Sequence, residues 1–143
     1  MEIVDWKTAA DDLRRAAEDR SAFQAIYKDF LGKIADRQPH DAVEGLLVKV
    51  TGGVAEVSFA NASLHLRFEV NHAFRRGLIV VHDLNDADER GKATRIGQVE
   101  FDEGGATATA LPPSHRVVHV NDREGAHAIL LSLIRAALLR RPS

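Results

Sequence analysis

The stretch from Leu64 to Val70 alternates strictly between apolar and polar side chains. Its even-numbered positions are apolar and its odd-numbered positions are polar, in the order Leu64, His65, Leu66, Arg67, Phe68, Glu69, Val70. Successive side chains of a strand point to opposite faces of the sheet, so one face of this segment is buried and the other meets water. A sheet with one wet face is typical of antiparallel strands.

The same two-residue period covers the middle of the chain. Gly52-Gly53 and Asp102 to Gly105 have the composition of hairpin turns. Asp83 to Gly91 is predicted to be a polar loop, and residues 117–120 add a short edge strand. The other predicted strands cover 46–51, 54–59, 64–70, 78–81, 93–101 and 106–110.

Helical spacing flanks this region on both sides. Thr8 to Asp11 and Ser21 to Gln24 resemble capping boxes, and they predict two N-terminal helices, or one helix with a kink, ending near Pro39. Asn121 to Glu124 opens a last helix that runs to about Arg140. We therefore predict a single α+β domain over residues 1–143, an antiparallel β-meander of about five to six strands flanked by N-terminal helices and a long C-terminal helix.

Composition narrows the chemistry. The 143 residues carry a formal charge of −2 and no cysteine, which excludes disulfides, thiolate metal sites and cysteine nucleophiles. The first residues lack the basic and long apolar regions of a secretory signal, and the most apolar stretch, 126–139, is shorter than the ~20 residues of a membrane span. We expect a cytoplasmic protein without membrane attachment.

The seven histidines are the first candidates for catalysis or ligand binding. His115 and His119 are four apart in an extended segment, about 13 Å from each other, which disfavours a shared metal. His82 and Asp83 are neighbours on a strand and point to opposite faces, which disfavours an acid/base pair. We assign no catalytic residue, metal or cofactor. If the domain binds a small molecule between sheet and helices, His65, His82 and His119 are its predicted polar anchors.

A small basic cluster, Arg75 and Arg76, lies beside Phe74. It would serve a regulator that binds nucleic acid, with other arginines of the chain extending the surface. The negative net charge and the scatter of these arginines make nucleic acid an unlikely partner.

The last helix has a wider apolar arc than one sheet can cover. Leu131 and Leu139 lie well around the helix from its core-facing positions, which are predicted to be Ala126, Ile129, Leu130, Leu133, Ala137 and Leu138. We therefore predict a partner or homodimer interface at Leu131, Arg135 and Leu139. The resulting hypothesis is a non-catalytic protein-interaction module that binds, neutralises or escorts a protein partner and self-associates. A small enzyme or ligand-binding domain is the first alternative and a nucleic-acid-binding regulator is the second.

Overall fold

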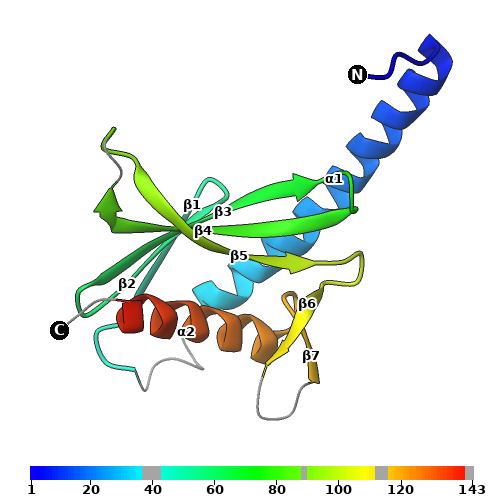
Figure 1. Ribbon diagram of the computed structural model, residues 1–143. Helices are drawn as coiled ribbons and strands as arrows, with labels where there is room; N and C mark the ends of the chain where they lie inside the picture. Colours follow the sequence, from blue (N-terminus) through cyan, green and yellow to red (C-terminus); the bar gives the residue numbers. More distant parts are fainter. Residues whose placement is uncertain (37–42, 88–89, 112–115, 141–143) are drawn as a thin grey trace.

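The computed structural model in Figure 1 describes residues 1–36, 43–87, 90–111 and 116–140. It confirms the predicted α+β class: an N-terminal helix, an antiparallel meander and a C-terminal helix. The sheet has seven strands in the order β1-β2-β3-β4-β5-β6-β7, each antiparallel to its neighbours. The elements are α1 (Trp6–Ala35), β1 (Leu47–Thr51), β2 (Val54–Phe59), β3 (Ala62–Asn71), β4 (Arg76–Ala87), β5 (Ala93–Phe101), β6 (Ala106–Leu111), β7 (Arg116–His119) and α2 (Arg123–Arg140).

The two predicted N-terminal helices form a single continuous helix, α1 (Figure 1). Its N-cap is Asp5, whose carboxylate accepts the backbone N–H groups of Lys7 and Thr8, each at 3.0 Å. These bonds lower the pKa of Asp5. The prediction of caps at Thr8 and Ser21 was therefore wrong, because both residues lie inside the helix and Ser21 is an exposed surface position. The helix ends at Ala35, and the predicted end near Pro39 lies outside the described residues.

The seventh strand is β7, the short edge strand predicted at 117–120, and β4 is longer than predicted. Asp83 to Gly91 was predicted to be a loop, but β4 continues through Asp83 to Ala87 and pairs with β5 as far as Ala93. Two irregularities interrupt this pairing, one between Val81 and His82 and one between Asp83 and Ala87. Polar composition gave the wrong answer here, because a strand next to a bulge can expose polar side chains on both sides.

The core lies between one face of the sheet and the two helices. Leu64 and Leu66 are fully buried on this face, as the alternation predicts, and Phe68 further along β3 is half-buried. Tyr27 of α1 stacks on Phe68 with ring centroids 5.3 Å apart. Its hydroxyl donates to the carbonyl of Gly53 at 2.8 Å, with the Leu66 carbonyl at 3.3 Å, and burial raises the pKa of Tyr27 to about 12.

The helix α2 crosses the same face and is tied to the end of α1. The buried His127 ring places Nδ1 2.8 Å from the Arg123 carbonyl and Nε2 3.0 Å from the Asp36 carbonyl. Ile134 is not among the predicted core-facing positions but is buried, whereas Leu133, which was predicted to face the core, is only half-buried. Within the described residues, neither helix is both long and apolar enough to span a lipid bilayer.

Candidate protein-interaction site

The first half of α1, residues Trp6–Asp19, extends away from the sheet and from α2 (Figure 1). We call this segment the projecting half. At 1.5 Å per residue it is about 20 Å long. Residues 1–22 contain no buried side chain, and the first buried residue of the helix is Phe23. The projecting half is therefore a solvated helix, held by its continuity with the buried half and by a contact of its last residue, Asp19, with Arg75.

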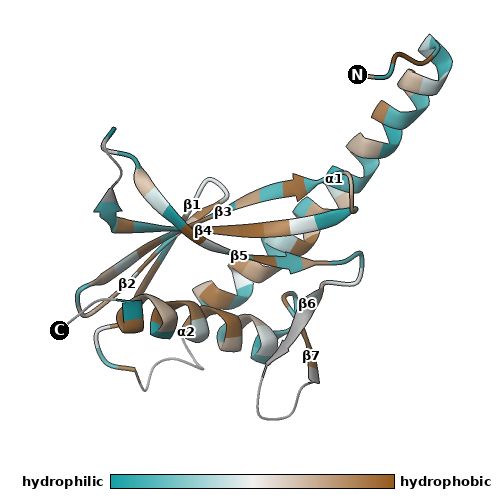
Figure 2. Cartoon of the chain, viewed as in Figure 1, coloured by the Kyte–Doolittle hydropathy of each residue, from teal (hydrophilic) through white to brown (hydrophobic). Residues whose placement is uncertain are grey.

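An apolar stripe nevertheless continues along the projecting half. Trp6 and Leu13, one heptad apart, are 75% and 71% exposed. Ile3 before the helix is 85% exposed, and Figure 2 shows the segment that precedes α1 as apolar. Small residues continue the stripe, at Ala9 and Ala10 between the two large ones and at Ala16 and Ala17 after them. Residues three, four and seven apart share one helix face, so this stripe is one unpartnered surface.

Ion pairs mark the place where α1 leaves the sheet. Arg75, in the β3–β4 turn, donates from Nη2 to Asp19 of α1 at 2.9 Å and lies 3.0 Å from Glu103 in the β5–β6 turn. This contact lowers the pKa of Asp19 and raises that of Arg75. The predicted basic cluster therefore has a partner within the chain, and the Arg76 guanidinium donates to the Arg75 carbonyl at 3.3 Å.

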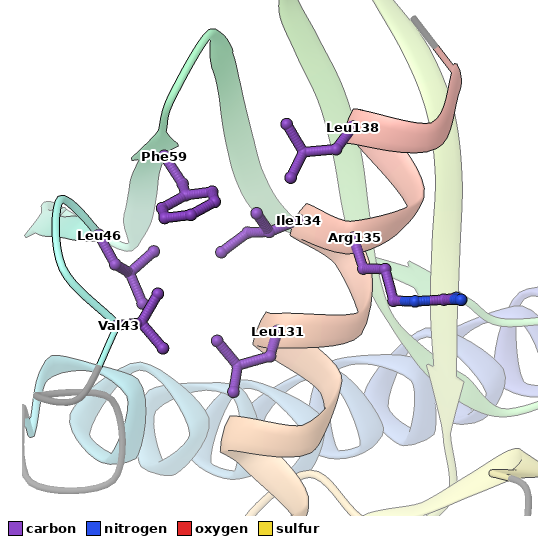
Figure 3. Close-up of a pocket in the computed structure, with 7 residues that line it drawn as sticks. All are labelled: Val43, Leu46, Phe59, Leu131, Ile134, Arg135 and Leu138. Atoms are coloured by element: carbon purple, nitrogen blue, oxygen red, sulfur yellow. The ribbon is translucent and has the colours of Figure 1, made fainter.

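An apolar groove lies beside α2 (Figure 3). Its cavity volume is about 160 Å³. One wall consists of Val43 and Leu46, which precede β1, together with Phe59 at the end of β2. The other wall is α2, which contributes Leu131, Ile134 and Leu138. The groove is shaped to take an apolar group rather than a charged one.

The three predicted interface residues of α2 occupy different positions around the groove. Leu131 points into it, whereas Arg135 stands at its rim with the guanidinium directed away (Figure 3). Leu139 is not part of the lining and is 69% exposed. Leu131 is half-buried and Arg135 is exposed. The structure thus places a hollow, rather than a flat leucine patch, where the sequence predicts an interface.

Two of the three predicted ligand-binding histidines meet on the face of the sheet opposite the core. His65 and His82 are direct cross-strand partners on β3 and β4, with ring centroids 6.0 Å apart. His82 is also opposite Arg95 of β5. Its Nδ1 is buried without a hydrogen-bond partner among the described residues. Burial first, and then the charges of Arg67, His65 and Arg95, lower the pKa of His82.

The charges on this face are balanced. Arg67 and Arg95 both contact Glu69, at 2.9 and 3.3 Å, and Gln98 links Arg95 to Glu100. The face therefore has no surplus of positive charge for an anion.

His119 does not join this pair, because it lies on β7, three strands away from β4. Asp83 is buried and shares the face of its cross-strand partner Leu64, so it does not pair with His82. Among the described residues no group of three or more His, Asp or Glu side chains could hold a metal ion.

Sequence reasoning identified the apolar spacing at Ala9, Leu13 and Ala16 but did not single out Trp6. The stripe was read as helix packing because an amphipathic pattern looks the same whether its partner is in the chain or outside it. One signal was available: Ile3, Val4 and Trp6 form a short apolar cluster next to many charged residues. Comparisons with protein-family models, with curated proteins and with solved structures gave no match.

Proposed function

We propose that this chain is a non-catalytic protein-interaction module that binds a protein partner and self-associates, with the projecting half of α1 as its principal contact element. One observation carries the proposal: a helix segment of about 20 Å keeps a continuous apolar stripe although nothing in the described chain packs against it.

Exposed apolar side chains on the projecting half carry a free-energy cost. Burying a large apolar side chain stabilises by roughly 1.5–3 kcal/mol relative to leaving it in water. Trp6 and Leu13 leave that stabilisation unused in the monomer, and tryptophan is among the residues that dominate binding at protein interfaces. A segment of 14 residues is also marginal as an isolated helix, so packing against a partner would stabilise it.

The chemistry on the sheet supports the same choice over catalysis. Asp83 is turned away from His82, and the two arginines beside the histidine pair are balanced by Glu69 and Glu100. A protein-interaction module does not need a histidine paired with an aspartate or an arginine free to bind substrate. Its requirements are an exposed apolar surface and a rigid support, and the ion pairs of Arg75 together with the buried half of α1 supply the support.

The test compares two faces of the same helix. Trp6→Glu and Leu13→Glu place charges in the stripe, and Arg15→Ala changes the net charge by the same −1 at an exposed position outside the stripe. Each protein is measured by light scattering after size exclusion, and tagged versions are used to recover partners from the source cell. We expect the stripe variants to lose self-association and partner together and the Arg15 variant to keep both. Equal behaviour of all three variants would refute the proposal.

A second candidate function is binding of a small molecule at the histidine pair. The observation that favours it is the unpartnered, buried Nδ1 of His82. Nuclear magnetic resonance of the two imidazole rings, recorded while a panel of small metabolites is added, tests it. Saturable shifts at both His65 and His82, lost in His82→Gln, are expected if this face is a site.

A further inference from the structure

We infer that the groove beside α2 receives the first turn of α1 from a second copy of the chain, with the Trp6 indole in the cavity. This inference rests on the self-association proposed above and names the surface on which the projecting half docks.

Size and polarity match on both sides. A cavity of about 150 Å³ lined by apolar side chains is large enough to bind benzene. The groove measures about 160 Å³, and its walls include Phe59, Leu131 and Ile134. An exposed aromatic ring is available at Trp6, with Ile3 beside it to cover the rim.

The chain cannot fill its own groove with Trp6. The ends of α1 and α2 meet where Asp36 contacts His127. Measured from there, Trp6 lies about 45 Å away along α1, because thirty residues rise 1.5 Å each. The far end of the groove, at Leu138, lies only about 17 Å from His127 along α2. A gap of more than 25 Å along rigid helices separates the indole from its cavity, so the occupant comes from another copy.

Charge favours the same pair of surfaces. Residues 1–13 carry four carboxylates and one lysine. Of the two arginines in residues 127–140, Arg140 is paired with Asp86 at 3.6 Å, whereas Arg135 stands at the rim and, among the described residues, forms no ion pair. The acidic, apolar tip of α1 therefore meets an unpaired guanidinium on the α2 side of the groove, and the exposed Glu44 on the other wall restricts its carboxylates to that side.

The contact joins two different surfaces, the tip of one copy and the groove of the next, so it differs from a two-fold dimer in which α2 packs against α2. It closes when two copies exchange tips across a two-fold axis or when several copies form a ring, and otherwise it extends as an open chain.

Complementation distinguishes these geometries. Trp6→Ala removes the indole from the tip of α1 and leaves the groove intact. Leu131→Glu places a charge in the groove and leaves the tip intact. We expect each variant alone to associate about thirtyfold or more weakly than the wild type, as loss of an interface anchor does. Mixed together, they should form a one-to-one heterodimer that grows no further. The wild type should increase in mass with concentration, to two copies or more. Arg15→Ala and Ala136→Glu, an exposed position outside the groove lining, are the matched controls on α1 and α2, and both should behave as the wild type.

Circular dichroism and thermal unfolding establish that each variant is folded, and Leu131→Gln replaces Leu131→Glu if the charge prevents folding. Association lost in Trp6→Ala without complementation by the groove variant would overturn this docking geometry while leaving the proposed function intact. Association unchanged in Trp6→Ala would overturn both.

Discussion

The two halves of α1 follow the same hydrophobic spacing and have opposite surroundings. From Phe23 to Ile34 the stripe is buried against the sheet and α2, and from Trp6 to Ala17 the equivalent positions face water. The difference arises from the length of the sheet, which ends before the helix does (Figure 1). An amphipathic stripe therefore indicates that a helix packs against a partner. Whether that partner belongs to the same chain depends on how far the neighbouring sheet and helix extend.

The largest difference in stability is expected between truncations of a large apolar side chain in the two halves of α1. Phe30 is fully buried, so Phe30→Ala should lower the free energy of unfolding by about 3–5 kcal/mol, through lost burial and the cavity left behind. Leu13→Ala, on the exposed stripe, should lower it by well under about 1 kcal/mol at concentrations where the chain is monomeric. Urea unfolding followed by circular dichroism measures both. Similar losses at the two positions would mean that the projecting half is packed within the chain.

The next effect concerns the hydrogen bonds that fasten the buried half to the sheet. Tyr27→Phe keeps the stacked ring and removes the hydroxyl that bonds the Gly53 carbonyl. We expect a loss of about 1 kcal/mol, the net value of one hydrogen bond whose acceptor is left without its donor. The same urea experiment detects it, with Tyr27→Leu as a harsher reference that also removes the ring stack. An unchanged free energy of unfolding in Tyr27→Phe would show that water replaces the hydroxyl as hydrogen-bond donor without loss of stability.

Between pH 8 and pH 5, the loss of stability in acid should come from His82 on the sheet and not from the projecting half. The pKa of His82 is lowered from its ordinary value of 6.5, so the folded protein resists protonation while the unfolded chain accepts the proton. Stability is therefore full above pH 6.5 and falls as the pH drops below it, toward the lowered pKa. His82→Gln should flatten this dependence in urea melts between pH 8 and pH 5 relative to exposed His72→Gln. A slope that survives in His82→Gln would assign the acid response to another group.

The smallest effect is expected from a charge in the projecting half. Leucine and glutamate have similar helix propensities, and Leu13 has no partner to lose. Leu13→Glu should therefore change the free energy of unfolding of the monomer by less than about 0.5 kcal/mol, even though it abolishes association. A large loss of stability in dilute solution would show that the two effects cannot be separated and that the stripe belongs to the fold.

Local sequence patterns predicted which helices and strands form better than they predicted the residues at which these elements begin and end. The alternation from Leu64 to Val70 identified β3 and its buried face, because burial of one face leaves a period of two in the sequence. The break expected before Ser21 does not exist, because polar residues inside a solvated helix resemble a cap. The pairing of His65 with His82 could not be predicted, since no residue pattern fixes which positions of two strands are opposite each other. The groove beside Leu131 could not be predicted for the same reason, because its other wall at Val43 and Phe59 comes from distant parts of the chain.

The Asp19–Arg75–Glu103 contact makes the attachment of the projecting half sensitive to salt. Arg75 and Glu103 are half or more exposed, and ion pairs between exposed groups weaken as salt screens them, over a distance of about 10 Å at 0.1 M. The buried half of α1 is held by apolar packing, which salt does not screen. Ionic strength therefore acts on one end of the helix and leaves the other end fixed.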